Sequence, residues 1–450
     1  MNNIQWIVNI HLNYSTFSKL NRIMDLIAPS PRNPVPNPGW LTNVLLNFGE
    51  ITEEVSVDDV KESEEGRMGK GNIIPFKLKY KTKDTNKDIN ILQFPQTLIA
   101  KYSIASGKSE SDFDKGAPMI IDKKVFQFLT VAREGWVFKE MPGGTFSPPK
   151  VYHSFADFNE PQNMFVLMED LRPSGIRLDQ YHGAQGGSHL DTVSLARPCM
   201  SSKQAWKAAF KEVAVTHAKH WNLRNLPKEA EEKLKFSSWS KGKNRKQWET
   251  SLMACRHAWN AIDKSKISDR VKNFLTIVYD NATFERAVER LNNRPKTLVH
   301  GDFHAKNLFW HIDKKSVIMT DFSEVGVGNP LSDLGQYIIS DVEPEVRRQH
   351  EHEVLTAYWN KLTSSGVDPE EYTFSQCWKS YENDSLDRFV WFYPILHYFD
   401  YNPKFFHDNI DAFLADHDID ADKFVLVNGV EMVEETNANK NHCKDFKIAG

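Results

Sequence analysis

The predicted fold is decided by residues 298–334, which read LVHGDFHAKNLFWHIDKKSVIMTDFSEVGVGNPLSDL. An apolar approach leads into residues 300–302 (HGD), and Asn307 follows Asp302 by five residues. Two short apolar runs, residues 308–312 and 316–320, then flank the polar tripeptide 313–315 (DKK). This pattern is typical of a β-hairpin with a three-residue turn.

The hairpin is predicted to bring polar side chains together where its two strands begin and end. A turn centred on Lys314 predicts that Asn307 lies opposite Asp321, with Cβ atoms roughly 4.5–5.5 Å apart. An amide oxygen and a carboxylate at that separation can share a Mg²⁺, which takes few protein ligands. Asp302 lies just before the hairpin and can accept a proton from a hydroxyl. This is the layout of a phosphoryl-transfer site; the alternative is that these are ordinary polar residues at strand ends and turns.

Residues 300–302 with Asn307, followed by residues 320–322 (TDF), resemble the signature of the aminoglycoside phosphotransferase and choline kinase superfamily. Within it, the chain is most similar to the ecdysteroid-kinase-like (CHK) small-molecule kinases. The resemblance implies that Asp302 is the catalytic base, that Asn307 and Asp321 bind magnesium, and that Asp333 braces the catalytic loop. His304 matches the aminoglycoside-kinase form of the loop, whereas ecdysteroid-kinase relatives often carry an aromatic residue there.

The resemblance also implies a fold class. It is α+β, a two-lobed protein-kinase-like fold with an N-terminal antiparallel sheet lobe that carries a helix and a larger, mainly helical C-terminal lobe. We expect the nucleotide-binding lobe with an N-terminal extension at residues 1–168 and the catalytic and substrate-binding lobe at residues 169–427. Residues 428–450 lose apolar periodicity and are predicted to form a flexible tail.

The N-terminal pattern fits a sheet lobe. Residues 1–30 could form a strand and a helix, and residues 30–39 are a proline-rich connector. The apolar spacing predicts a helix at 40–48 and strands at 51–57, 72–81, 96–104, 148–152 and 164–168. The glycine-rich residues 66–71 (GRMGKG) lie where kinases cover the nucleotide phosphates. Backbone amides there could cradle phosphate, and a solvated hairpin tip is equally consistent.

Two charged residues point to nucleotide binding. Lys101 ends an apolar strand, and a half-buried lysine needs a partner or an exit to water. Glu134, in the helical pattern 125–141, is the best partner and matches the position of the family's lysine-pairing glutamate. Lys101 would then hold the α- and β-phosphates of ATP; the alternative is a surface lysine on an edge strand.

Residues 164–171 (MFVLMEDL) describe a strand that stops at acidic residues, as an interlobe hinge does. By resemblance, backbone groups near Met168, Glu169 and Asp170 would hold the adenine.

The rest of the chain is predicted to be mainly helical. Residues 178–200 are a Gly/His/Ser-rich loop, and 203–222 form an amphipathic helix whose His217 and His220 we assign to core packing rather than to ligand binding. Residues 377–392 mix an aromatic face with several charges. A solvated acidic face is the default interpretation, and the alternative is that these residues line the acceptor pocket. The charges concerned are Glu382, Asp384, Asp387 and Arg388.

Bulk composition excludes several classes of function. The net charge of −4, from 56 basic and 60 acidic residues, shows no excess of basic residues of the kind that binds nucleic acids. The four cysteines are widely spaced, so a reduced, cytoplasmic setting is expected. No basic n-region precedes the apolar N-terminal residues, and no run approaches the ~20 apolar residues of a membrane span. Gly107-Lys108-Ser109 lacks the leading glycine of a P-loop.

The sequence therefore predicts an ATP- and Mg²⁺-dependent phosphotransferase that acts on a hydroxyl of a small molecule, of the sterol-like or amino-alcohol class. Only eight residues separate Asp321 from Pro330, too few for the activation segment that docks a peptide. Its partners would be the nucleotide and this acceptor, with no nucleic acid and no membrane span. The alternatives are an aminoglycoside- or choline-type kinase and a catalytically silent kinase-fold binding protein.

Overall fold

The chain folds into two compact units, each built from separated stretches of sequence. A computed structural model describes residues 28–29, 33–66, 73–84, 89–102, 133–141, 146–156, 164–182, 200–234, 245–398 and 403–419. The first unit comprises residues 1–182, 187–216 and 302–325, and the second comprises residues 183–186, 217–301 and 326–450. The predicted boundaries after residues 168 and 427 stay predictions.

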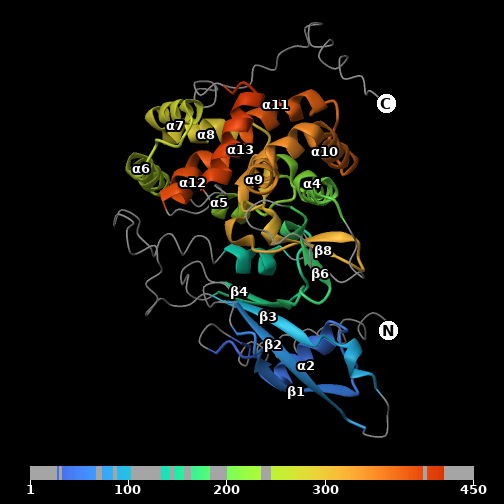
Figure 1. The fold of residues 1–450 in the computed structure, drawn as a ribbon. Coiled ribbons are helices and arrows are strands. Elements are labelled where there is room, and N and C mark those ends of the chain that lie inside the picture. The colour runs from blue at the N-terminus through green and yellow to red at the C-terminus, as the bar shows by residue number, and fades with distance from the viewer. Residues whose placement is uncertain are drawn as a thin grey trace, which may run out of the picture. The chain divides into compact units, whose positions relative to one another are not determined.

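The first unit contains a five-stranded antiparallel sheet in the order β1-β2-β3-β5-β4 (Figure 1). The prediction of a strand at residues 51–57 was displaced: the strand begins at Val55 and continues through a charged second half. Its buried side chains, Val55, Val57 and Val60, recur every second or third residue. The strands are β1 (Val55–Glu62), β2 (Ile73–Thr82), β3 (Thr97–Tyr102), β4 (Val151–Ala156) and β5 (Met164–Glu169).

One face of this sheet is covered by helix α2 (Pro38–Asn47), which lies beside β1 and β2 in Figure 1. Asn37 caps the helix by accepting hydrogen bonds from the amides of Gly39 and Trp40 at 2.9 and 3.3 Å. The apolar side chains of α2 join the buried residues of β1 to β5 in one core. This face therefore supplies most of the apolar burial of the sheet.

The opposite face of the five-stranded sheet positions the charged side chain of Lys101. Ile99 of β3 packs there with Val166 and Met168 of β5, and Phe138 of the helical residues 133–140 covers them. Side chains alternate along a strand, so Lys101, two residues after Ile99, emerges on this same face. The pleat alone therefore directs Lys101 toward residues 133–140.

A smaller sheet of the first unit has the order β6-β8-β9, from β6 (Gly175–Arg177), β8 (Leu308–His311) and β9 (Ser316–Met319). The predicted hairpin of β8 and β9 is present, but its register is one residue from the prediction. Leu308 pairs with Met319 and His311 with Ser316, so the turn holds the four residues 312–315. Lys315 adopts φ +50°, a left-handed conformation that glycine and asparagine adopt most readily. A lysine at this position gives no sequence signal for such a turn.

The register corrects the predicted position of Asn307. Its carbonyl accepts hydrogen bonds from the backbone N–H and the hydroxyl of Thr320, at 2.8 and 3.0 Å, so Asn307 faces Thr320 and not Asp321. A one-residue shift would normally turn the Asp321 side chain to the other face of the ribbon. Asp321 lies beyond the end of β9 and adopts the left-handed region, at φ +63° and ψ +68°, so the alternation of the strand does not set the direction of its side chain.

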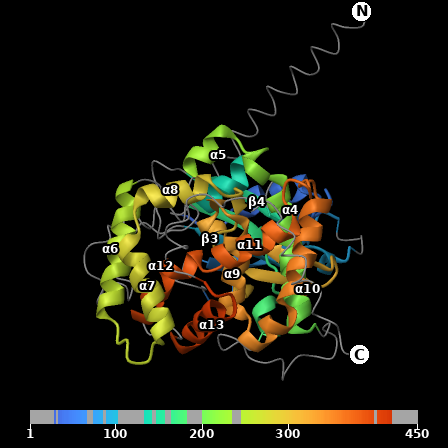
Figure 2. The ribbon, with the colours of Figure 1, turned by 90° about the horizontal axis from the view of Figure 1, so that it is seen from above.

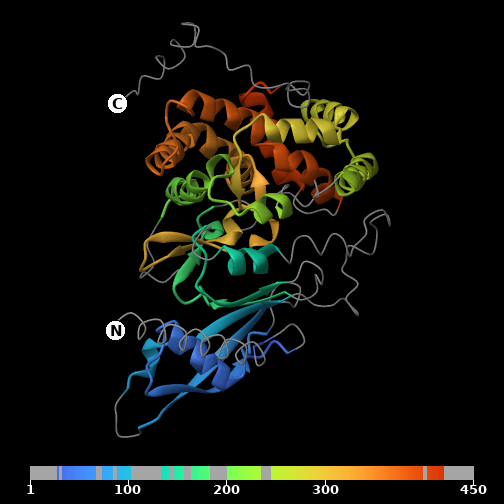
Figure 3. The same ribbon diagram turned by 180° about the vertical axis from the view of Figure 1, so that it is seen from behind.

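The second unit is mainly helical. Its two short strands, β7 (Thr297–Val299) and β10 (Gly326–Gly328), pair antiparallel. Figure 2 shows α6, α7 and α12 next to one another, and Figure 3 shows α9 to α13 from behind. Helix α4 (Ser202–Lys219) begins in the first unit and ends in the second. The other helices are α5 (Lys228–Lys233), α6 (Arg245–Ala261), α7 (Asp269–Asn281), α8 (Phe284–Asn292), α9 (Pro330–Asp341), α10 (Pro344–Ser364), α11 (Phe374–Asp384), α12 (Asp387–Tyr398) and α13 (Pro403–Asp416).

The predicted solvated acidic face at residues 377–392 is wrong for two of its charges. Asp384 and Arg388 are buried, at 2% and 7% exposure. Asp384 pairs with Arg290 and Arg294 from the region of α8, and Arg388 bonds to the carbonyl of Gly301. Their partners lie about 90 residues away in the chain, so the local charge pattern could not reveal them.

Several predictions lie outside the described residues. These are the strand and helix at residues 1–30 except residues 28–29, the loop at 66–71 except Gly66, residues 125–132 of the helix at 125–141, most of the loop at 178–200 and the tail from residue 428. Within the described part of the chain, the helices fall short of the length and apolar character that crossing a membrane requires.

Candidate active site

Lys101 is the centre of an ion-pair cluster in the first unit. Its Nζ lies 2.5 Å from Oε2 of Glu134 and 2.7 Å from Oδ1 of Asp321. Burial alone would lower the pKa of the lysine, but the two carboxylates outweigh it and raise that pKa. Lys101 therefore stays protonated across the whole neutral range.

Glu134 connects this lysine to the backbone after Asp321. Its other oxygen, Oε1, accepts the backbone N–H of Phe322 at 3.2 Å. The Phe322 ring stacks on Phe146 and meets Phe138 edge to face. Burial raises the pKa of Glu134, whose side chain is 1% exposed, although Lys101 acts against this rise. The glutamate thus fixes both the lysine and the chain that carries Asp321.

Asp321 is the exposed member of the cluster. Its side chain is 40% accessible, and its Oδ1 accepts hydrogen bonds from Lys101 and from the hydroxyl of Ser323 at 2.8 Å. Burial of its carboxylate would raise its pKa, yet Lys101 and Ser323 lower it below the usual value. Asp321 is therefore ionised at neutral pH, with one carboxylate oxygen turned away from the lysine.

Asp302 and Asn307 form a second group in the same unit. The amide nitrogen of Asn307 donates to the backbone carbonyl of Asp302 at 3.0 Å and to its Oδ2 at 3.2 Å. Nε2 of His304 lies 3.5 Å from the same Oδ2. The side chain of Asp302 is 22% exposed, and its charge acts on Asp321. The short 3₁₀ turn Ala305–Asn307 sets these contacts.

These residues suit a divalent cation. The hydrogen bonds of Asn307 use its nitrogen, and those of Asp321 use Oδ1, so one amide oxygen and one carboxylate oxygen make no hydrogen bond within the described chain. Hard oxygen donors of this kind bind Mg²⁺, which keeps several waters. No cluster of three or more His, Cys, Asp or Glu suited to a metal exists among the residues that the structure describes. Asn307 and Asp321 are the residues here that would hold such a cation.

The catalytic-loop backbone is anchored within the second unit by Asp333. Its carboxylate accepts the N–H of His300 at 2.7 Å and the N–H of Gly301 at 2.9 Å. These two amides belong to the residues that precede Asp302, so the predicted bracing role of Asp333 is present in the structure. Asp333 lies in the first turn of α9, where the helix dipole favours a carboxylate.

Two further residues hold this anchor, and the sequence did not assign them a role at the site. His217 lies 3.3 Å from Oδ2 of Asp333 and 3.0 Å from the hydroxyl of Tyr358. It is fully buried, in agreement with the predicted core packing. Arg388 donates to the carbonyl of Gly301, so both the backbone N–H and the backbone carbonyl of Gly301 are held. The only sequence signal for Arg388 was its place in an aromatic helix.

The predicted adenine-binding segment is engaged in structural contacts. The N–H of Glu169 donates to the carbonyl of Lys150 at 2.8 Å, and Glu169 Oε1 accepts the N–H of Lys150 at 2.8 Å. Asp170 holds Arg172 through both carboxylate oxygens. Met168 is nearly buried in the sheet. The side chains of Glu169 and Asp170 therefore shape the turn, and an adenine-holding role of this segment stays a prediction.

Taken together, the predicted residues fall into two contact groups. Lys101, Glu134 and Asp321 are joined directly, as are Asp302 and Asn307. The contact of His304 with Asp302 was not predicted from the sequence. Its position two residues after Asp302 was the available signal.

A family model described as "Ecdysteroid kinase-like family" matches residues 73–366, about two thirds of the chain. The chain belongs to the ecdysteroid kinase-like family. This membership confirms the family and the enzyme class expected from the sequence, a small-molecule kinase. With the antiparallel sheet of one unit and the helices of the other, it also confirms the predicted α+β, protein-kinase-like fold class.

Solved structures similar to this ecdysteroid kinase-like chain share little of its sequence. An ethanolamine kinase of Plasmodium vivax is 12% identical, with a TM-score of 0.42 over 83% of this chain and 86% of that one. A choline kinase from Cryptosporidium parvum is 13% identical, with a TM-score of 0.43 over 83% and 93%. A microcompartment-associated aminopropanol kinase is 12% identical, with a TM-score of 0.41 over 86% and 98%. No protein with a curated description matches the chain.

Proposed function

We propose that this ecdysteroid kinase-like protein transfers the γ-phosphoryl group of ATP, with Mg²⁺, to a hydroxyl of a small molecule. The observation that carries the proposal is the ion-pair cluster of Lys101 with Glu134 and Asp321. A buried lysine held by a structural carboxylate and also by an exposed one is arranged to exchange the exposed partner for phosphate oxygens.

Each residue has a distinct role in this proposal. Lys101 binds the α- and β-phosphates, and Glu134 keeps its ammonium group in place. Asn307 and Asp321 hold the cation, which supplies charge neutralisation at the phosphate oxygens when bound. Asp302 orients the acceptor hydroxyl and accepts its proton. Asn307 also directs Asp302, since its amide nitrogen bonds to the carboxylate.

The acceptor is proposed to be a sterol-like or amino-alcohol compound, and the description of the family favours the sterol-like class. The competing proposal is a catalytically silent binding protein. The cluster argues against it, because a fold without phosphate chemistry gains nothing from an exposed carboxylate beside Lys101.

The decisive experiment compares Asp302→Asn with Asp321→Asn. Asparagine is the matched replacement in both, since it removes the charge and tolerates the left-handed backbone of Asp321. In Asp302→Asn we expect the single-turnover rate to fall roughly 10²–10⁴-fold with nucleotide affinity nearly unchanged. In Asp321→Asn we expect Mg²⁺-dependent nucleotide binding to weaken. Wild-type rates in both variants would refute the proposal.

A further inference from the structure

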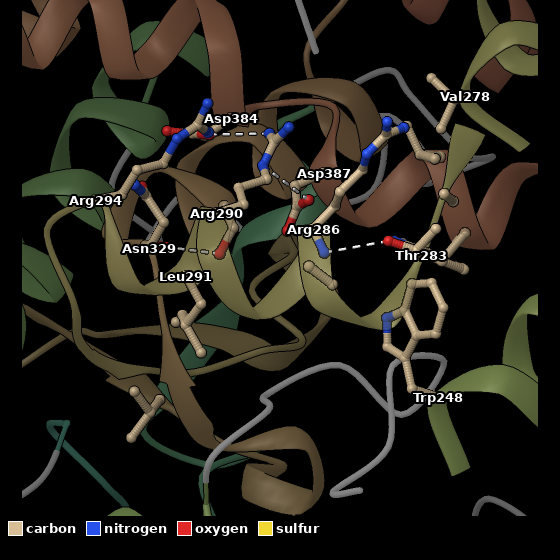
Figure 4. A pocket seen from close by; sticks show the side chains of 17 residues that line it. Trp248, Val278, Thr283, Arg286, Arg290, Leu291, Arg294, Asn329, Asp384 and Asp387 are labelled. Carbon is tan, nitrogen blue, oxygen red and sulfur yellow. Dashed lines mark hydrogen bonds and ion pairs between the residues drawn. The ribbon is translucent and has the colours of Figure 1, made fainter. Parts of the chain in front are cut away.

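The second unit contains a pocket of about 90 Å³ that is lined by Asp384 and Asp387 but by none of the residues assigned above to catalysis, nucleotide binding or the cation. Its walls come from α6, α7, α8, α9, α11, α12 and β10 (Figure 4). Trp248, Val278, Val390 and Trp391 give it an apolar side. Figure 4 shows Trp248 at one end and Arg294 with Asp384 at the other, so the pocket has an apolar end and a charged end.

The lining of the pocket as a whole carries an excess of positive charge. Arg286 and Arg290 lie one turn apart on α8, and Arg294 follows just after the helix (Figure 4). Asp384 pairs with both Arg290, at 3.0 Å, and Arg294, while Asp387 lies 3.8 Å from Arg290. Arg286 donates to the backbone carbonyl of Asn281 at 2.7 Å. Three guanidinium groups and two carboxylates thus line the pocket, and of the three only Arg290 and Arg294 pair with the carboxylates.

Hydrogen-bond donors also outnumber acceptors along this wall. Among the residues that the structure describes, Arg294 Nη2, Asn329 Nδ2 and Trp248 Nε1 are buried and make no hydrogen bond. Among the described side chains of this wall, Oδ2 of Asp384 is the one buried acceptor that makes no hydrogen bond. A buried donor without an acceptor is costly, and native structures satisfy such groups with protein, water or ligand.

Burial and the neighbouring charges both act on the pKa values of these arginines. Burial lowers the pKa of Arg294, and the nearby charge of Arg290 lowers it further, while Asp387 acts in the opposite direction. Burial likewise lowers the pKa of Arg290. An anion in the pocket would offset the repulsion between these two side chains, whereas a second cation would add to it.

We propose that this pocket binds a small molecule with an apolar ring and an acidic oxygen group, such as a carboxylate, sulfonate or phosphate. The acidic group accepts hydrogen bonds from Arg294 and Asn329, and the ring lies against Trp248 and Trp391. All of these residues belong to the second unit, so the proposal does not depend on phosphoryl transfer.

The alternative is that the arginines only join α8 to α11. Arg290 with Asp384 would be enough for that purpose, and the donors of Asn329 and Trp248 would then have no role. This alternative predicts that nothing with an acidic group binds preferentially, and the experiment decides between the two.

The probes are naphthalene-2-sulfonate, the neutral isostere naphthalene-2-sulfonamide and the cationic 2-naphthylmethylammonium. Binding to the full chain is measured by calorimetry without nucleotide. We expect the sulfonate to bind about tenfold or more tightly than the sulfonamide, and the ammonium compound not to bind. Equal affinities for all three, or no binding of naphthalene-2-sulfonate and of the smaller benzenesulfonate, would overturn the proposal.

Asn329→Asp is the sharpest variant. Oδ1 of Asn329 caps α9 by accepting the N–H of Leu331 at 2.8 Å, and aspartate keeps that acceptor while replacing the inward donor with a negative oxygen. We expect sulfonate affinity to fall about tenfold or more, with an unchanged melting temperature. Arg270→Gln, an exposed arginine on α7 paired with Asp411, is the matched control and should bind as wild type. Wild-type affinity in Asn329→Asp would contradict the proposal.

Discussion

Lys101 has two carboxylate partners, and only Glu134 is buried. The difference in exposure separates a structural role from a catalytic one. Glu134 cannot leave its ammonium partner without becoming an isolated buried charge, which costs several kcal/mol. Asp321 can release Lys101 more readily than Glu134 can, because 40% of its side chain is accessible to water. At the scale of single residues, the cluster is therefore a fixed pair with one exchangeable member.

This distinction predicts different outcomes for Lys101→Met and for the double variant Lys101→Met with Glu134→Gln. The single variant leaves Glu134 buried without its cation, and we expect the free energy of unfolding to fall by roughly 3–5 kcal/mol. The double variant removes that charge and should recover much of the stability. Both variants should lose roughly 10²–10³-fold in kcat, since the phosphate-binding cation is gone. Chemical denaturation and steady-state kinetics measure the two effects.

The control for this pair is Lys404→Met, an exposed lysine on α13 whose partner is Asp408. It should leave both stability and kcat unchanged, because exposed ion pairs contribute little. A double variant that regains activity together with stability would show that Lys101 acts only on the fold.

Helix α9 carries the Asp333 anchor, and a glycine sets its distance from α11. A Cβ added at Gly335 would lie 2.2 Å from the Cα and the carbonyl oxygen of Ser385, both main-chain atoms. No side-chain rearrangement can make room for it. At the scale of elements, Gly335 thus allows the close approach that holds α9 in place.

We expect Gly335→Ala to lower the free energy of unfolding by at least about 1–3 kcal/mol, the usual cost of overpacking. The higher helix propensity of alanine, worth about 1 kcal/mol, should not compensate. Thermal unfolding followed by circular dichroism measures the change. Adding Ser385→Gly should not rescue the variant, since the clash involves the main chain, and a rescue would mean that the helices separate more easily than their packing indicates.

The helices α10, α11 and α13 meet around His417. This imidazole lies 3.3 Å from Glu351 and 3.9 Å from Glu382, and Arg347 and Tyr381 also face it. Burial would lower the pKa of His417, but the two carboxylates raise it above its usual value. The protonated form is therefore the one that stabilises this junction.

The sign of the pH dependence follows from this raised pKa. The stabilisation is complete below the unfolded-state pKa of about 6.5 and is lost as the pH rises through the higher pKa of the folded protein. We expect His417→Gln to be less stable than wild type at pH below about 6.5, with the difference shrinking at higher pH. Urea unfolding of both proteins across this range measures it. A difference that grows with pH would contradict the assignment.

For the whole molecule, ATP binding should appear as stabilisation. A ligand that binds only the folded state at a hundred times its Kd adds about 2.7 kcal/mol. We expect Mg²⁺ with ATP to raise the melting temperature of the wild type and not that of Asp321→Asn. Mg²⁺ with a nucleoside lacking phosphates is the control and should produce no shift. A wild type that ignores ATP would favour the silent binding protein.

The parts of this molecule that could be predicted from the sequence are those fixed by local chain order. The hairpin after Asp302 depends on short spacings, whereas the bracing carboxylate of Asp333 was implied by the family resemblance, and Glu134 was chosen as the partner of Lys101 with the help of that resemblance. The register of the hairpin was missed because Lys315 takes a left-handed conformation without glycine or asparagine. The burial of Asp384 was missed because its arginine partners are distant in sequence, and charges are normally solvated.

The division of the chain between the two units limits which fragments of its gene can encode a complete unit. Residues 302–325, which supply Asp302, Asn307 and Asp321, belong to the first unit although more than one hundred residues of the chain come between them and its N-terminal part. A gene fragment ending at residue 182 would encode the sheet without these three side chains. We infer that neither half of the chain can be moved to another protein by itself, in evolution or in engineering, with its unit complete. The two halves have to be kept together.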